Sequence, residues 1–257
     1  AADNYTRALL VGVLNTLLVS FIGIVLTIIL GTIIGVLRLS TNWLVSRLAA
    51  VYIEVFQDIP VLLQLFFWYA LFYEVLPSPR QALSPFSGVF MSNRGLVIAI
   101  PEYAPAHMYM AIAFLTGCLV VYFLRRWARK RQAKTGEYFP VFSVSIGLLI
   151  VLPLTAWLAG GAPTAMSVPQ LKGFNFQGGQ NISPEFSALL LGLVLYTAAF
   201  VAEVVRAGIQ AVSKGQREAA MSIGLKPAQV LNLVILPQAL RVIIPPLTSQ
   251  MLNLMKN

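Results

Sequence analysis

Six apolar stretches, most of them long enough to cross a membrane, constrain this chain more than any other feature. A membrane helix needs about 20 apolar residues, because the hydrocarbon core is about 30 Å thick and each helical residue rises about 1.5 Å. The first stretch meets this length without a single charged residue. The candidate spans are Leu10–Leu37, Ala49–Leu76, Met108–Leu124, Val141–Leu158, Phe186–Val205 and Ile243–Met255. The sequence therefore predicts an all-α integral membrane protein with about six spans.

The composition agrees with a membrane protein and argues against a metal site. Hydrophobic residues make up 58% of the chain and charged residues only 11%, whereas soluble domains carry about 25% charged residues. Cys118 and His107 are single residues of their kinds, so we expect no disulfide and no metal ligand cluster. The opening AADNYTRALL lacks a signal peptide. The last apolar stretch stops at Asn257, so we expect a chain cut at both ends.

The distribution of Lys and Arg predicts the orientation, because short cytoplasmic loops carry an excess of positive charge. Thirteen of the 18 basic residues fall on one side of the predicted spans. They are Arg38, Arg47, the six within Arg125–Lys134, Arg206, Lys214, Arg217, Lys226 and Arg241. We therefore assign this side to the cytoplasm. The basic run, which we define as Arg125–Lys134, is then a topology anchor, with specific lipid or nucleic-acid contact as the alternative. The other loops, 77–106 and 160–184, are predicted to be ordered external loops or short surface helices.

One polar segment on the cytoplasmic side stands out between the last two spans. It predicts a helix over Gln216–Ile223, a turn at Gly224, and a second helix over Pro227–Leu236 that stops near Pro237. Glycine is favoured where a helix ends in a left-handed residue, and proline is tolerated in a first turn. Small residues on this bend would let another protein approach its backbone closely, so the segment is shaped to dock into a partner. The small residues are Ala219, Ala220 and Gly224.

A DNA-binding helix–turn–helix is a rival interpretation of the same segment. Gln216, Ala220, Gly224 and Val230 fit its spacing. Such a unit needs a third helix and its own core, and here membrane spans begin within a few residues on either side. We therefore expect no nucleic-acid partner.

The residues of this segment resemble the signature loop of bacterial ABC importer permeases, EAA-x3-G-x9-I-x-LP. The loop is matched by Glu218-Ala219-Ala220, Gly224, Val234 in place of Ile, and Leu236-Pro237. In that family the loop is the coupling helix that fits a cleft of the ATPase subunit. Further stretches resemble the polar, or general, amino-acid branch of the family. These are Gly12–Ser40, Tyr52–Phe67, Ala198–Ala220 and Leu236–Asn257.

The resemblance implies a type I permease core and a single domain over 1–257. Residues 74–184 are then an inserted region with two additional spans, and 213–237 is the cytoplasmic coupling loop. Because an even number of spans is inserted, the loop stays in the cytoplasm. The sequence departs from the family at Gln57-Asp58-Ile59, where Arg-Gly-Thr is usual, and this bears on substrate preference.

The resemblance also implies a bacterial inner-membrane subunit that imports amino acids but is no enzyme. The chain has no G-x4-GK[ST] phosphate loop, so no cofactor is expected here, and ATP with Mg²⁺ belongs to a partner. The implied partners are an ATPase dimer, a second homologous permease subunit, a periplasmic amino-acid-binding protein, the amino acid and the lipid bilayer. An ion-coupled secondary transporter is the alternative, but it leaves the Glu218–Pro237 pattern unexplained.

Three polar residues of the second span are candidates for binding the solute: Glu54, Asp58 and Gln64. Charges facing lipid are costly, so such residues face protein or water and are functional by default. Glu54 and Asp58 are four residues apart, on one helix face, and would bind an ammonium group. Alternatively, Glu54 snorkels, Asp58 accepts the N–H groups freed at Pro60, or both contact another subunit. Glu203 and Arg206 predict a local ion pair.

Overall fold

A computed structural model describes residues 2–256, with side chains from Tyr5 onward. The chain divides into two compact units. Unit 1 comprises Ala1–Pro85, Phe90–Leu96 and Asn181–Asn257, and unit 2 comprises Phe86–Val89 and Val97–Gln180. The sequence predicts one domain with an inserted region over 74–184. The structure gathers most of that region into a unit of its own.

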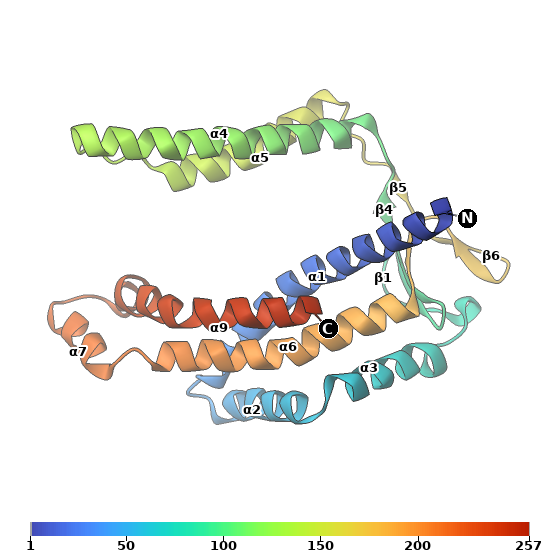
Figure 1. Cartoon of the computed structure of the whole chain (residues 1–257), viewed down its shortest axis with the longest axis horizontal. Coiled ribbons are helices and arrows are strands. Elements are labelled where there is room, and N and C mark those ends of the chain that lie inside the picture. The colour runs from blue at the N-terminus through green and yellow to red at the C-terminus, as the bar shows by residue number, and fades with distance from the viewer. Residues whose placement is uncertain (1, 257) are drawn as a thin grey trace. The chain divides into compact units, whose positions relative to one another are not determined.

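Unit 1 is a helical bundle in which α6 is the central element (Figure 1). Its helices are α1 (Ala2–Arg38), α2 (Trp43–Asp58), α3 (Val61–Ala70), α6 (Pro184–Gln210), α7 (Lys214–Ser222), α8 (Pro227–Val230) and α9 (Leu236–Lys256). Two π-helical turns, Leu71–Val75 and Leu231–Ile235, follow α3 and α8. Helices α1, α2, α3 and α9 all pack against α6. This arrangement explains why α6 is the most buried of the candidate spans.

Small residues bring α1 and α6 into backbone contact. Ala198 and Ala202 of α6 are completely buried. A Cβ atom added to Gly31 would lie 2.6 Å from the Val201 Cβ, and one added to Gly35 would lie 2.6 Å from the Ala202 carbonyl oxygen. The hydrophobic effect does not drive helices together within a bilayer, so close packing of small residues must drive their association. The sequence predicts this packing role for Gly12, Gly23, Gly31 and Gly35; a Cβ on Gly12 would meet no described atom.

Unit 2 contains two packed helices, α4 (Pro105–Thr135) and α5 (Val141–Ala159). Helix α4 ends at Gly136, whose left-handed φ of +71° and N–H bond to the Gln132 carbonyl (2.9 Å) close the last turn. The basic run therefore continues the helix beyond the apolar part of α4 instead of forming a loop. Arg131 pairs with Glu137 at 2.6 Å.

Short strands occupy the segments that the sequence predicts as loops or surface helices. They are β1 (Leu83–Phe86), β2 (Val89–Ser92), β3 (Gly95–Ile98), β4 (Ile100–Pro101), β5 (Met166–Ser167), β6 (Gln170–Lys172), β7 (Asn175–Gln177) and β8 (Gln180–Ile182), with a 3-10 turn at Pro79–Gln81. One sheet has the order β1-β2-β3-β8, and β4-β5 and β6-β7 form antiparallel pairs. Gly88 and Gly173 turn the chain between strands with φ of +78° and +68°.

Five helices of the described chain are long and apolar enough to cross a membrane, and a bent pair makes a sixth candidate. The prediction of a continuous second span is wrong, because Trp43–Asp58 and Val61–Val75 meet at a 102° bend. The predicted helix stop near Pro237 is also wrong, since the helix runs on from Pro227 to Lys256. In the π turn before Pro237, the Leu236 N–H bonds the Leu231 carbonyl, and this wider turn accommodates the proline.

The contact between α1 and α6 predicts a position-specific effect of adding a side chain to glycine. Gly31→Leu should lower the thermal midpoint of the purified protein, because overpacking costs about 1–3 kcal/mol. Gly12→Leu is the matched control on the same helix and should leave the midpoint nearly unchanged. Thermal unfolding in detergent, followed by tryptophan fluorescence, measures both. Equal midpoints for the two variants would contradict this packing.

Candidate functional site

The segment between α6 and α9 forms a polar elbow, which we define as residues 214–230. Helix α7 ends at Ser222, and the chain turns at Gly224, whose φ of +85° is left-handed. The Leu225 N–H donates to the Ala220 carbonyl (3.3 Å), and the Gly224 N–H donates to the Met221 carbonyl (2.9 Å). These bonds satisfy carbonyls that a helix end leaves without partners. The turn of the elbow is therefore set by its own backbone.

The second arm of the elbow begins with a built-in cap. Pro227 stands in the first turn of α8, where its missing N–H is not needed. The Lys226 N–H donates to Gln229 Oε1 at 2.9 Å. The elbow thus has the predicted short first helix and the predicted turn at Gly224, whereas its second arm continues into the membrane helix that ends at Lys256.

The inner side of the elbow is fixed to the membrane helices by an apolar cluster. Ala220, Val230 and Ile235 are buried in it. Its partly buried members are Ile209, Val212, Leu225 and Val234. The cluster therefore joins α7 and α8 to the last turn of α6 and to the π turn that precedes α9.

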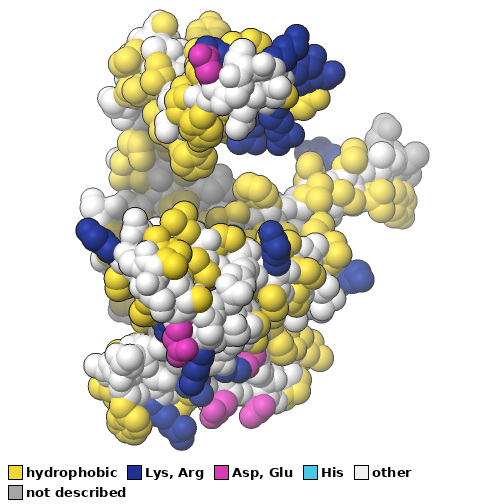
Figure 2. All heavy atoms as spheres, turned by 90° about the vertical axis from the view of Figure 1, so that its left-hand side faces the viewer, with side chains coloured by type: hydrophobic (Ala, Val, Ile, Leu, Met, Phe, Trp, Pro, Cys, Tyr) yellow, Lys and Arg dark blue, Asp and Glu magenta, His cyan; other side chains and the backbone are white. Residues whose placement is uncertain are grey.

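The outer side of the elbow exposes an apolar face next to charges. Ile223 is 78% exposed and Met221 is 47% exposed. A Cβ added to Gly224 would meet no described atom, so the backbone here is open to another molecule. The end of unit 1 that carries α7 shows apolar side chains beside Lys and Arg (Figure 2).

The predicted coupling residues divide between the two sides. Glu218, Ala219 and Gly224 are exposed, and Ala220 is buried in the cluster. Leu236 and Pro237 are exposed at the start of α9. Ala220 is therefore small because α7 packs there against other parts of this chain. Ala219 and Gly224 instead leave the outer surface of the elbow open to another molecule.

The broken second span is held together by Gln64. In an unbroken helix the Phe56 carbonyl would accept a hydrogen bond from the N–H of residue 60, but Pro60 has no N–H. Gln64 Nε2 donates to the carbonyls of Phe56 (3.0 Å) and Ile59 (2.9 Å), which replaces the missing donor. The side chain is buried, and its Oε1 has no partner among the described residues. Gln64 therefore bonds the backbone at the break. Its amide group has this role separately from Glu54 and Asp58, the two carboxylates with which the sequence groups it.

Glu54 and Asp58 are exposed on the surface of α2, and neither forms a hydrogen bond or ion pair with the described residues. Asp58 does not serve the break at Pro60, because Gln64 does. The opposite face of α2 is tied to α6. Tyr52 Oη donates to the Leu195 carbonyl (2.7 Å), and Gln57 Nε2 donates to the Ala199 carbonyl (3.3 Å).

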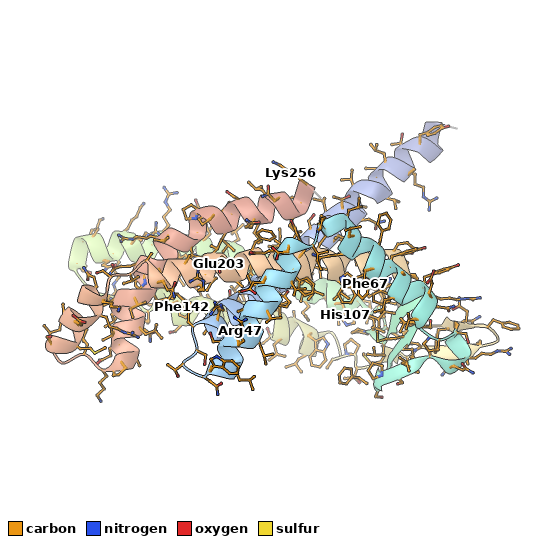
Figure 3. All side chains as sticks on the ribbon, turned by 90° about the horizontal axis from the view of Figure 1, so that it is seen from below. Arg47, Phe67, His107, Phe142, Glu203 and Lys256 are labelled. Atoms are coloured by element: carbon orange, nitrogen blue, oxygen red, sulfur yellow. The ribbon has the colours of Figure 1, made fainter. Side chains whose placement is uncertain are left out.

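Glu203 and Arg206 form the predicted ion pair near the end of α6. The Arg206 Nε–Glu203 Oε2 distance is 2.9 Å, and Arg206 Nη1 also donates to Gln210 Oε1. This ion pair is a local contact within α6, the helix on which Figure 3 labels Glu203.

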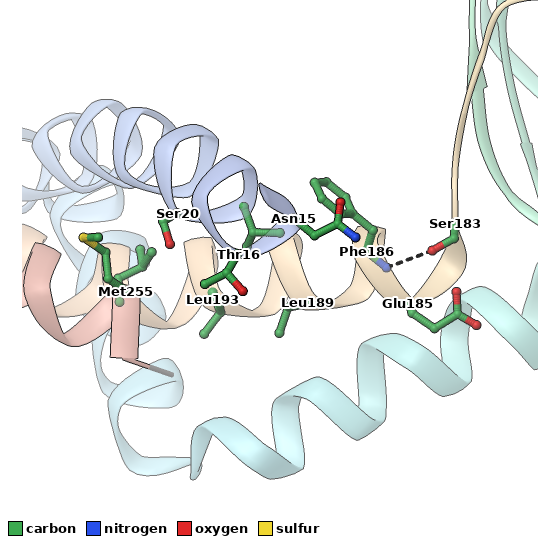
Figure 4. Close-up of a pocket in the computed structure, with 11 residues that line it drawn as sticks. Asn15, Thr16, Ser20, Ser183, Glu185, Phe186, Leu189, Leu193 and Met255 are labelled. Atoms are coloured by element: carbon green, nitrogen blue, oxygen red, sulfur yellow. Dashed lines mark hydrogen bonds between the residues drawn. The ribbon is translucent and has the colours of Figure 1, made fainter. Parts of the chain in front are cut away.

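Two of the cavities that border α6 have polar side chains in their lining. The first, of about 360 Å³, lies between α1, the start of α6 and the end of α9 (Figure 4). Asn15 and Ser20 line it together with Glu185, while the Ser183 hydroxyl accepts from the Phe186 N–H (3.3 Å) and caps α6. Thr16 also lines it, and its hydroxyl donates to the Gly12 carbonyl (2.9 Å).

The second cavity, of about 390 Å³, lies between α6 and α9, and we call it the α6–α9 cavity. It is lined by Tyr196, Thr197, Phe200, Gln250, Asn253 and Lys256. The sequence-based candidates do not include these residues. The sequence could have indicated this polar helix face, because the polar residues Gln250, Asn253 and Lys256 recur at every third position along an apolar helix.

Comparisons with known proteins define the class. The profile of the family described as binding-protein-dependent transport system inner membrane component matches residues 133–257. A solved structure described as an amino acid ABC transporter with histidines has the same fold over 99% of this chain and 71% of its own (TM-score 0.50, 21% identity). The fold is therefore that of an inner-membrane ABC permease, which confirms the predicted class.

Curated relatives are similar over nearly the whole chain. The general L-amino acid permease AapQ of Rhizobium johnstonii is 49% identical over 99% of this chain, and the putative amino-acid permease YhdX of Escherichia coli is 49% identical over 99%. The chain spans 64% and 65% of these two proteins. The glutamate/glutamine/aspartate/asparagine permease BztB of Rhodobacter capsulatus is 41% identical, with 67% of its length covered. The chain belongs to the family of amino-acid ABC transporter permeases.

The hydrogen bonds of Gln64 predict a structural phenotype at the break. Gln64→Leu leaves two carbonyls without a donor, at a cost of about 1–3 kcal/mol for a buried unsatisfied group. The thermal midpoint in detergent should fall. Gln57→Leu is the control in the same span, because its single acceptor, Ala199, belongs to the interior of α6. If Gln57→Leu lowered the midpoint as much as Gln64→Leu, the role of Gln64 would be wrong.

Proposed function

We propose that this chain is the membrane subunit of an ATP-driven importer that moves amino acids into the bacterial cytoplasm. The observation that carries this proposal is the elbow, an open, apolar-faced bend fixed to two membrane helices. The relatives are permeases of amino-acid transport systems, which supports the solute class. An ion-coupled secondary transporter is not favoured, because these relatives belong to ABC systems.

The elbow is the part that a separate ATPase subunit would move. Ile223 and Met221 offer apolar area for a cleft, and Gly224 allows the cleft to approach the backbone. On the inner side, the cluster around Ala220 and Val230 passes the displacement to α6 and α9. ATP and Mg²⁺ are bound by the partner in this proposal, and this chain supplies the lever.

The other partners follow from the surfaces that this chain leaves open. Glu54 and Asp58 are exposed in a membrane helix, where an unpaired charge is costly. A second permease subunit, or a water-filled pathway between the subunits, would accommodate them. A periplasmic binding protein would deliver the amino acid on the opposite side of the membrane from the elbow.

The docking role predicts that a charge at Gly224 uncouples transport from ATP hydrolysis. Gly224→Asp places an unpaired carboxylate in the interface, which should lower both uptake and binding-protein-stimulated ATPase activity about tenfold or more. The measurement uses the assembled complex in proteoliposomes.

Gly136→Asp is the matched control, because Gly136 has a similar left-handed φ of +71° and equally open surroundings. It should retain both activities. Ile223→Asp is a second test, since a side chain so exposed contributes little to folding. Normal uptake by Gly224→Asp and Ile223→Asp would refute the docking assignment.

A further inference from the structure

The basic run extends α4 beyond the hydrocarbon core of the membrane. Helix α4 has 31 residues and begins at Pro105. At about 1.5 Å per residue, its first 20 or so residues cross a core of about 30 Å, which places Arg125 at the boundary. The headgroup layer beyond the boundary is about 5–7 Å thick. Because helical side chains point back toward the N-terminus, those of Arg129 and Lys130 also reach this layer.

Four basic residues at this depth share one face of α4, and we call them the basic face. They are Arg125, Arg126, Arg129 and Lys130, which are three or four positions apart across neighbouring turns. All four are exposed, and within residues 5–256 none has an ion-pair partner. Figure 2 shows Lys and Arg side chains gathered on the end of unit 2, in the upper part of the view. Like charges at this spacing repel one another, and an anion between them removes the repulsion.

The opposite face of the same segment is occupied by unit 2 itself. The Trp127 ring packs edge to face on Phe139, with centroids 5.4 Å apart. The Arg131 guanidinium lies over the Trp127 ring, 5.4 Å from its centroid, and pairs with Glu137. The other acidic residue of unit 2, Glu102, precedes the far end of α4. Unit 2, all of which the structure describes, therefore has no acidic residue left for the basic face.

An exposed apolar stripe continues the basic face into the hydrocarbon. Leu115, Leu119 and Tyr122 are three or four positions apart along α4, and each is more than half exposed. The same spacing leads from Tyr122 to Arg125 and Arg126. A phospholipid has the matching order, with a phosphate group above two apolar chains. An acidic soluble protein or a nucleic acid would match the charge alone, and would have to enter the headgroup layer to reach it.

We propose that the basic face of α4 is a binding site for the phosphate groups of anionic phospholipids in the cytoplasmic leaflet. Each arginine can donate two parallel N–H bonds to a phosphate group, and the lysine adds a point charge. The acyl chains of the bound lipid lie along Leu119 and Tyr122. The positive-inside rule depends only on the number of basic residues on one side, whereas this site requires that four of them share a face. The site does not rest on the proposed import function.

The test measures which lipid surrounds α4 in the purified chain. The single cysteine, Cys118, is exposed and lies seven residues before Arg125 on the same helix face. A fluorophore on its thiol therefore reports the acyl chains beneath the basic face. The chain is reconstituted into phosphatidylcholine vesicles with a constant minor share of phosphatidylglycerol. Either the phosphatidylglycerol or an equal amount of phosphatidylcholine carries brominated acyl chains, which quench the fluorophore. Quenching by the brominated phosphatidylglycerol should be about threefold greater or more.

Substitutions separate the basic face from the total charge. Changing all four of its residues to Gln should reduce the quenching ratio to about one, and changing its three arginines to Lys should keep most of the ratio. Arg129→Gln alone should lower the ratio in the same direction with less risk to folding. The matched control removes four exposed basic residues elsewhere on the predicted cytoplasmic side and should keep the wild-type ratio. Its changes are Lys214→Gln, Arg217→Gln, Lys226→Gln and Arg241→Gln.

Two results would overturn the lipid site. Equal quenching by the two brominated lipids in the wild-type chain would show that anionic lipid is not enriched beside α4, and would leave an acidic protein surface as the occupant of the basic face. An equal loss of the ratio in the control set would show that the enrichment follows net charge and not the arrangement of residues on α4.

Discussion

The close contact between α1 and α6 is the constraint on which the rest of unit 1 depends. In lipid, apolar side chains gain little by leaving the solvent, so helices associate where their backbones can approach. Gly31 and Gly35 of α1 lie against the buried run around Ala198 and Ala202 of α6. With α6 held in this way, α2, α3 and α9 pack on its other sides. The helix that leads into the elbow is therefore also the best-anchored helix of the bundle.

The proposed role of the elbow depends on the anchoring of α6. Its turn is closed by backbone hydrogen bonds at Gly224, and its inner face shares an apolar cluster with the ends of α6 and α9. In the proposed function, a displacement of the elbow reaches α6 and α9 through this cluster.

Sequence patterns predicted most of the helices, because a span of about 20 apolar residues has few alternatives in a membrane. The elbow could be predicted equally well, because a glycine such as Gly224 is typical of a helix end and a proline such as Pro227 is typical of a first helical turn. Pro60 predicts a kink but not a bend of 102°, because the donor that replaces its N–H, Gln64, lies beyond the break. The strands in 83–98 and 166–182 escaped prediction because each has only two to four residues. The α6–α9 cavity was missed because Thr197 and Lys256 are 59 positions apart and meet only through tertiary packing.

The most direct test of the central claim is to identify what touches the elbow in the assembled particle. In a Cys118→Ser background, Ile223→Cys carries a unique thiol to which a photo-cross-linker is attached, and the adduct is identified by mass spectrometry. The account predicts that the main adduct joins residue 223 to the ATPase subunit. An adduct with the periplasmic binding protein, or none with the ATPase subunit, would contradict it.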